Sequence, residues 1–260
     1  DIDVLFLCLG HHESAKILPM LEIPAEVRII DLSQDFRLQG DAVPGERSFV
    51  YGLPELQRAA IQSTQYIANP GCFATAIQLA LLPLANARRL KPVHVTGITG
   101  ATGAGQALQA AVHFSWRANN ISAYKTLQHQ HVHEIKQSLT HLQPGEHAVH
   151  FIPWRGDFTR GIFASCCTPF EGTLDEAKAL YAQYYENEPF TKLSESPVDL
   201  KQVVNTNKCL LHLEYAEGQL VIHSVIDNLL KGASGQAVQN MNLCFGLDEK
   251  AGLQLKALNF

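Results

Sequence analysis

Long apolar runs, an excess of basic residues and a cysteine framework are all missing from this sequence. No apolar stretch approaches the ~20 residues that a membrane-spanning helix needs, so we expect no membrane span. The formal net charge is −5 with both signs mixed, which lacks the basic patch expected of a nucleic-acid-binding protein. Six cysteines without regular spacing and no visible signal peptide favour a reducing, cytoplasmic location over a disulfide-stapled secreted protein.

A glycine-rich G-x-G-x-x-G turn is also missing, although the first strands are of the kind that it usually follows. Asp3 to Leu9 is a continuous apolar run, typical of a strand buried on both faces, and Val27 to Leu32 is a second one. A short helix is predicted between them, from Ser14 to about Leu21. This β-α-β alternation predicts a doubly wound α/β sheet.

The clearest chemical signal lies between Tyr66 and Leu82. A short β-prone run ends at Ala68, Asn-Pro-Gly follows as a turn, and residues 72–82 are good helix formers with an apolar stripe. Cys72 is therefore predicted at the start of a helix, where free N–H groups and the helix dipole lower the pKa of a thiol. Cys72 is the predicted nucleophile, whereas the other five cysteines lie in apolar runs and are predicted to be structural.

The second half of the chain has the pattern of an α+β unit around a mixed or antiparallel sheet. Strands are predicted at 93–98, twice between 147 and 170, and at about 200–204, 208–215 and 219–226. Helices are predicted for 106–114, 173–186 and 230–243. The small, glycine-rich loop Thr99–Gly105 has backbone N–H groups that could form an anion-binding nest.

Three histidines alternate along the chain at His129, His131 and His133. In an extended segment they would share one face and could suggest zinc, but helical periodicity begins at Glu134, so a metal site is disfavoured. The better interpretation is that one histidine is the general acid/base for Cys72. Glu134 could orient that imidazole, or could be a first-turn carboxylate favoured by the helix dipole.

These motifs resemble, in order and over essentially the whole chain, those of the N-acetyl-γ-glutamyl-phosphate reductase family. The matching stretches are Ile30–Leu38, Tyr51–Glu55, Asn69–Leu84, Thr99–Gly105, His129–Ile135, Asn205–Asn207 and Ser224–Asn240. Where the family often has proline before the glutamate, this chain has His133. By this resemblance His131 is the preferred acid/base, with His129 second, and Arg160 is preferred over Arg155 as an anion ligand.

The resemblance also implies the remaining site residues and the fold. The catalytic set is Cys72, His131, His129 and Glu134; the substrate or phosphate ligands are Asn69, Ser33, Arg37, Thr99, Gly100 and Arg160; the cofactor-binding residues are His11, Gly71, Gly103, Asn228 and Gly232. The implied fold is a partial Rossmann-type NADP domain (1–71 and 230–260) carrying an inserted catalytic and dimerisation domain with a mixed or antiparallel sheet (72–229), as in semialdehyde and glyceraldehyde-phosphate dehydrogenases. Because the glycine-rich turn is absent, we expect it in a segment preceding this chain.

The implied reaction is the NADPH-dependent reduction of N-acetyl-γ-glutamyl phosphate to its semialdehyde through a cysteine thioester, in arginine biosynthesis. The cofactor is NADP(H), the partner is a small acyl-phosphate substrate, and the implied assembly is a homodimer or homotetramer. The alternatives are another phosphorylating semialdehyde dehydrogenase, such as aspartate-semialdehyde dehydrogenase, and an inactive chain that serves as a binding or assembly subunit.

Overall fold

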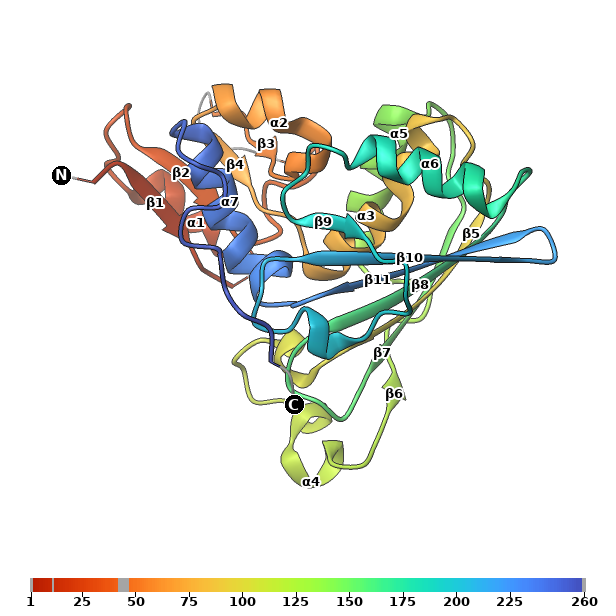
Figure 1. Cartoon of the computed structure of the whole chain (residues 1–260). Helices are drawn as coiled ribbons and strands as arrows, with labels where there is room; N and C mark the ends of the chain where they lie inside the picture. The colour runs from red at the N-terminus through yellow and green to blue at the C-terminus, as the bar shows by residue number, and fades with distance from the viewer. Residues whose placement is uncertain (1, 11, 42–46, 259–260) are drawn as a thin grey trace.

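A computed structural model describes residues 2–10, 12–41 and 47–258, and two sheets organise it (Figure 1). The smaller sheet has four parallel strands in the order β1-β2-β4-β3. Their bounds are β1 (Val4–Leu7), β2 (Arg28–Asp31), β3 (Val50–Tyr51) and β4 (Tyr66–Ala68). The predicted doubly wound portion is therefore confirmed, with strands shorter than their apolar runs.

Three helices accompany this sheet, namely α1 (Ser14–Ile17, continued by the 3₁₀ turn Leu18–Met20), α2 (Pro54–Ser63) and α7 (Gly235–Cys244). Helix α7 comes from the far end of the chain and packs on α2. Ala237 and Leu243 of α7 share a buried apolar cluster with Ile30, Ile61 and Ile67. The C-terminal helix thus completes the core of the N-terminal sheet.

The larger sheet has seven strands in the order β6-β7-β5-β8-β11-β10-β9. The strands are β5 (Val93–Thr99), β6 (Ser122–Ala123), β7 (Val149–Arg155), β8 (Ile162–Pro169), β9 (Thr191–Leu193), β10 (Cys209–Ala216) and β11 (Gln219–Ile226). Strand β5 runs parallel to β7, β9 runs parallel to β10, and the other pairs are antiparallel. The prediction of a mixed sheet is confirmed.

Helix α3 (Cys72–Asn86) links the two sheets and lies between the larger sheet and helices α5 (His131–Leu142) and α6 (Leu174–Tyr184) (Figure 1). Every residue from Phe73 to Ala85 is buried, as expected for a helix that is apolar on nearly all sides. Its first residue, Cys72, is half-buried. The most buried helix of the chain therefore holds the predicted nucleophile in a fixed position.

Two predicted elements are wrong. Residues 106–114 form no helix, only the 3₁₀ turn η3 (Ala110–Val112) and then the short α4 (Phe114–Arg117), because this segment has no core to pack on and leaves Leu108 and Phe114 exposed. Residues 200–204 are not a strand. The Asp199 side chain accepts a hydrogen bond from the N–H of Lys201 and Gln202 bonds back to Asp199, which starts the 3₁₀ turn η4 (Leu200–Gln202).

The predicted final helix has two parts. Its first turn is a π-helical turn, η5 (Leu230–Ser234), and α7 follows it directly. A further 3₁₀ turn, η2 (Ala101–Ala104), follows β5. In the ranges that the structure describes, none of the helices combines the length and hydropathy needed to cross a bilayer.

Candidate active site

Cys72 is the first residue of α3, as predicted, and follows the extended residue Gly71. The strand that precedes the turn, β4, lies in the middle of the parallel sheet, so its carboxyl end delivers the cysteine to the edge where open α/β sheets bind ligands. Gly232 of the π-helical turn packs against Cys72, since a Cβ added at Gly232 would lie 2.8 Å from the Cβ of Cys72. The nucleophile thus lies between two glycines.

The N–H groups at the helix start lower the pKa of this thiol, as predicted, but burial outweighs them. Burial raises the pKa of Cys72 to about 11, and the carboxylate of Glu134 acts in the same direction. The N–H of Phe73 and the guanidinium of Arg37 oppose this rise without cancelling it. The thiol therefore remains protonated at neutral pH, and a base must take its proton when it reacts.

The imidazole of His131 lies against Gly71, the residue before Cys72. A Cβ on Gly71 would lie 2.4 Å from its Nε2 and 2.6 Å from its Cε1. His131 is itself the first residue of a helix, α5, which packs on α3. Two helix N-termini therefore meet here, one carrying the cysteine and the other the histidine, and only a glycine before Cys72 leaves room for the ring.

Glu134 connects the elements around this pair. One carboxylate oxygen accepts hydrogen bonds from the hydroxyl of Tyr51 and from the N–H of Gly71, both at 2.9 Å. The other accepts one from Arg37 at 3.1 Å and lies 3.9 Å from His131 Nε2. Both interpretations of Glu134 therefore agree with its position, because it stands in the first turn of α5 and also beside the imidazole.

His129 occupies a different position from His131. Its Nδ1 accepts a hydrogen bond from the N–H of His131 at 3.2 Å, at the start of α5. Burial, followed by His131 and Lys125, lowers the pKa of His129 to about 3. His129 is therefore neutral at physiological pH and cannot donate a proton as an imidazolium. His133 is exposed on the helix, and among the described residues no three His, Cys, Asp or Glu side chains gather where they could share a metal ion.

A cavity of about 660 Å³ opens beside Cys72, and its lining residues come from three stretches of the chain, 32–73, 99–155 and 228–233. This volume is typical of small-molecule sites. The predicted residues that line it are Cys72, His129, His131, Arg37, Asn69, Thr99, Gly71, Gly103, Asn228 and Gly232. The lining also includes Tyr124, Lys125 and Arg155, which are outside the predicted set. The resemblance favours Arg160 over Arg155 as an anion ligand, but Arg155 is the one that lines the cavity.

Several predicted ligands have protein partners instead. Arg160 pairs with the buried carboxylate of Asp227 at 2.7 Å and lies outside the cavity lining. Ser33 donates to Asp31 at 2.7 Å and is also absent from the lining. Arg37 reaches the cavity, but its nitrogens donate to the carbonyls of Asn69 and Leu32 and to Glu134. His11 lies outside the described residues.

The proposed anion nest in the Thr99–Gly105 loop is wrong in its simple form. The N–H groups of Gly100, Ala101, Thr102, Gly103 and Gly105 all donate to backbone carbonyls, three of them to the 158–161 turn. Gly100 serves this packing, since a Cβ there would lie 2.5 Å from the carbonyl oxygen of Thr159. These N–H groups are therefore occupied, and the loop contributes side chains and shape to the cavity.

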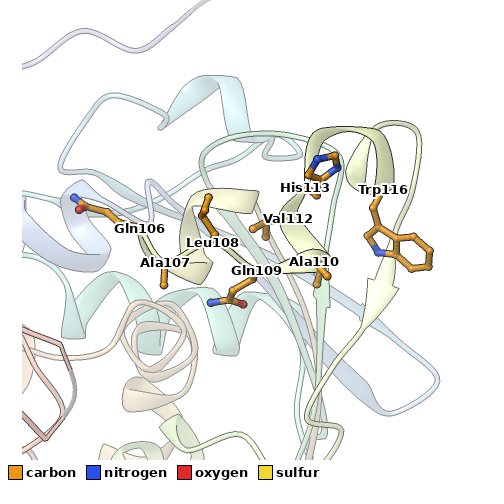
Figure 2. A pocket seen from close by; sticks show the side chains of 10 residues that line it. Gln106, Ala107, Leu108, Gln109, Ala110, Val112, His113 and Trp116 are labelled. Carbon is orange, nitrogen blue, oxygen red and sulfur yellow. The ribbon is translucent and has the colours of Figure 1, made fainter.

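A second hollow, of about 860 Å³, is lined only by residues between Gly105 and Trp116 (Figure 2). Its walls are mostly apolar, and His113 is its single titratable residue. It shares Gly105, Gln109 and Ala111 with the lining of the Cys72 cavity but contains neither the cysteine nor the histidine pair. Cys72 and the two predicted histidines therefore line the first cavity and not this one.

Comparison with known proteins agrees with this geometry. Two family models match the chain: "Semialdehyde dehydrogenase, NAD binding domain" over residues 1–64 and "Semialdehyde dehydrogenase, dimerisation domain" over residues 72–228. The N-acetyl-gamma-glutamyl-phosphate reductase of Christiangramia forsetii is 54% identical over 99% of this chain and 79% of its own length. The reductase of that name from Bacteroides fragilis is 54% identical over 100% of this chain and 80% of its own. The chain belongs to the N-acetyl-γ-glutamyl-phosphate reductase family.

Solved structures show the fold of this family in more distant proteins. Aspartate semialdehyde dehydrogenase II from Vibrio cholerae superposes with a TM-score of 0.72, covering 94% of this chain and 80% of that one. Its sequence is 18% identical, so the likeness concerns the fold alone. The predicted semialdehyde-dehydrogenase-like fold is thereby confirmed, and family membership separates this chain from the aspartate-semialdehyde alternative.

Proposed function

We propose that this chain catalyses the NADPH-dependent reduction of N-acetyl-γ-glutamyl phosphate to N-acetylglutamate 5-semialdehyde and phosphate, a step of arginine biosynthesis. One observation carries the proposal. Cys72 and His131 begin two packed helices, and Gly71 brings the imidazole against the backbone next to the thiol, at the wall of one cavity. A nucleophile, an adjacent base and a carboxylate beside that base are the elements of covalent catalysis by cysteine.

Cys72 is the proposed nucleophile. Its sulfur forms a bond to the γ-carbonyl carbon, the bond from that carbon to the phosphate oxygen breaks, and phosphate leaves. Because burial raises the pKa of the Cys72 thiol to about 11, His131 takes the thiol proton during attack and passes it to the departing phosphate. The acyl group is then held on the sulfur as a thioester.

During release of the aldehyde, the proton transfer between Cys72 and His131 runs in the opposite direction. NADPH, when bound, supplies the hydride that reduces the acyl group. As the carbon–sulfur bond breaks, His131 returns a proton, drawn from solvent, to the sulfur of Cys72. Glu134 holds the ring through this exchange, because its position is itself fixed by Arg37, Tyr51 and the N–H of Gly71.

The residues around Cys72 fit such a cofactor. Gly71 and Gly232 line the cavity at the cysteine, and neither has room for a Cβ, because the His131 ring lies against Gly71 and the Cβ of Cys72 lies against Gly232. Gly103 and Asn228 line the same cavity. Asn228 Oδ1 accepts from the N–H of Gly161 at 2.7 Å and its amide donates to Thr102 at 3.1 Å, so its orientation is set. These four residues would hold the nicotinamide end.

The test is NADP⁺ reduction with N-acetylglutamate semialdehyde and phosphate, the reverse direction. Cys72→Ser is expected to lower kcat by at least about 10³-fold, as loss of a covalent nucleophile does. The matched control is Cys167→Ser, a half-buried cysteine on the larger sheet, which should retain activity. Activity that survives in Cys72→Ser would overturn the mechanism. An inactive wild-type chain with no measurable affinity for NADPH would favour the alternative of a binding or assembly subunit.

We propose also that the chain is a cytoplasmic homodimer or homotetramer, divided into a nucleotide part (1–71 and 230–260) and a catalytic part (72–229). The match of residues 72–228 to a dimerisation domain supports the assembly, and the packing of α7 on α2 supports the division. All six cysteines are free, in agreement with a reducing compartment. Light scattering on the purified chain tests the subunit number, and a monomer at micromolar concentration would refute it.

A further inference from the structure

Arg155 is the last residue of β7 and lies opposite Thr99 in the register of the parallel pair β5/β7. Both residues line the cavity that contains Cys72. Arg155 follows Val149, Phe151 and Pro153 at intervals of two residues, and these three residues are buried. It therefore lies on the same face of the strand as they do. The sheet itself therefore delivers a guanidinium to the reaction cavity.

This guanidinium is buried and has no carboxylate partner. Arg155 is only 8% exposed, and its Nε has no hydrogen-bond partner. In the part of the chain that the structure describes, Arg37, Arg58 and Arg160 make the arginine–carboxylate ion pairs. The guanidinium of Arg155 instead contacts Tyr124, through a side-chain hydrogen bond and through the ring, whose centroid lies 4.7 Å from the Arg155 Cζ. A buried cation is costly unless an anion accompanies it, so the arrangement calls for an anionic ligand.

The neighbouring wall of the cavity is also positively charged. Lys125 lines it, with its Nζ bonded to the neutral amide oxygen of Gln130 at 2.9 Å. Lys125 and Arg155 both contribute to lowering the pKa of His129, after the larger effects of burial and His131. Glu134 acts on His129 in the opposite direction, but its oxygens are bonded to Tyr51, Gly71 and Arg37. This wall therefore attracts anions.

We propose that Arg155 binds an anionic group of the acyl-phosphate substrate, either its α-carboxylate or its phosphate, with the ring of Tyr124 supporting the guanidinium plane. The inference rests on the proposed function and deepens it, because it assigns the substrate-anion role to Arg155 instead of Arg160. Arginine is suited to this task, since its planar fork matches carboxylate and phosphate oxygens bidentately.

Kinetics in the direction of semialdehyde oxidation separate the two anions, because there the carboxylate and the phosphate enter on different reactants. Arg155→Gln is expected to raise the KM of one of them by about 10–100-fold, the equivalent of one lost charge-assisted contact, and Arg155→Lys to recover part of it. A raised KM for the semialdehyde assigns the carboxylate, and a raised KM for inorganic phosphate assigns the phosphate. If neither KM changes, the proposal is overturned.

The matched control is Arg89→Gln. Arg89 is half-buried, also stacks on an aromatic ring, with its Cζ 4.3 Å from the Phe170 centroid, and follows the end of α3 opposite to Cys72. Both KM values should be unchanged in this variant. A purely structural role for Arg155 predicts a lower Tm of Arg155→Gln with both KM values unaltered, and that result also refutes the proposal.

A second measurement requires no turnover and so separates this proposal from the proposed function. Cys72 of the full chain is alkylated with iodoacetamide, with and without N-acetylglutamate or inorganic phosphate, and modification is followed by mass spectrometry. Protection that is present in the wild type and in Arg89→Gln but lost in Arg155→Gln supports the anion site. Equal protection in all three proteins, or none in the wild type, overturns it.

Discussion

Replacing Gly71 by alanine tests the geometry on which the proposed mechanism depends. The backbone at Gly71, with φ −70° and ψ 150°, is a conformation that alanine adopts freely, so no backbone strain is introduced. The unfolded chain loses entropy with alanine, which by itself would stabilise the protein by about 0.4–1 kcal/mol. The substitution therefore acts in the folded state almost entirely through the added methyl group.

The methyl group would meet the imidazole of His131 at 2.4, 2.6 and 2.7 Å. Ordinary van der Waals contact begins at 3.4 Å, so the ring or the start of α3 must move by 3.4 − 2.4 = 1.0 Å. Misplacement of a catalytic group by this distance costs about 10²-fold in rate. Overpacking costs about 1–3 kcal/mol, partly offset by the entropy gain above.

We therefore expect Gly71→Ala to lower kcat by about 10²-fold while its unfolding midpoint in urea falls only slightly. The control is Gly40→Ala, where an added Cβ has no neighbour within 4 Å. Steady-state kinetics and urea denaturation of both variants provide the measurement. A Gly71→Ala protein with kcat within twofold of wild type would show that the His131 ring is not a positioned acid/base, and the reasoning would fail.

Three other predictions follow from the same site. Alkylation of Cys72 by iodoacetamide should keep accelerating from pH 8 to pH 10, because burial raises the pKa of this thiol to about 11; a plateau below pH 8 would contradict this. Burial lowers the pKa of His129 to about 3, below its unfolded value of about 6.5, so the folded state loses stability as the pH falls through that interval, by about 2 kcal/mol at pH 5. In urea titrations, the stability of His129→Gln should therefore depend less on acidic pH than that of the wild type. His131→Gln should instead lose at least about 10²-fold in kcat. Glu134→Gln should cost about 3–5 kcal/mol in the free energy of unfolding, because it leaves the buried guanidinium of Arg37 without its carboxylate; an unchanged urea midpoint would refute this.

Much of the fold could be predicted from local patterns. The continuous apolar runs of the first strands, the alternation of the later ones and the Asn-Pro-Gly turn before Cys72 each depend on neighbours within a few residues. The turn at Glu217-Gly218 joins β10 to β11, the two strands predicted at 208–215 and 219–226, and both of its residues have positive φ. Where local patterns misled, the deciding factor was the lack of a packing surface at residues 106–114 and the presence of the capping side chain of Asp199 at residues 200–204.

The sequence by itself determined that Cys72 begins a helix and that two histidines stand at the start of another, since a cysteine after Asn-Pro-Gly and histidines before a helical period are local signals. Only the tertiary structure decided which histidine lies against Gly71, and that burial outweighs the helix dipole in the pKa of Cys72. It also decided the surroundings of the two arginines: Arg160 pairs with Asp227, 67 residues along the chain, whereas Arg155 lines the cavity. Burial and long-range partners depend on how distant segments pack, so a local sequence pattern cannot predict them.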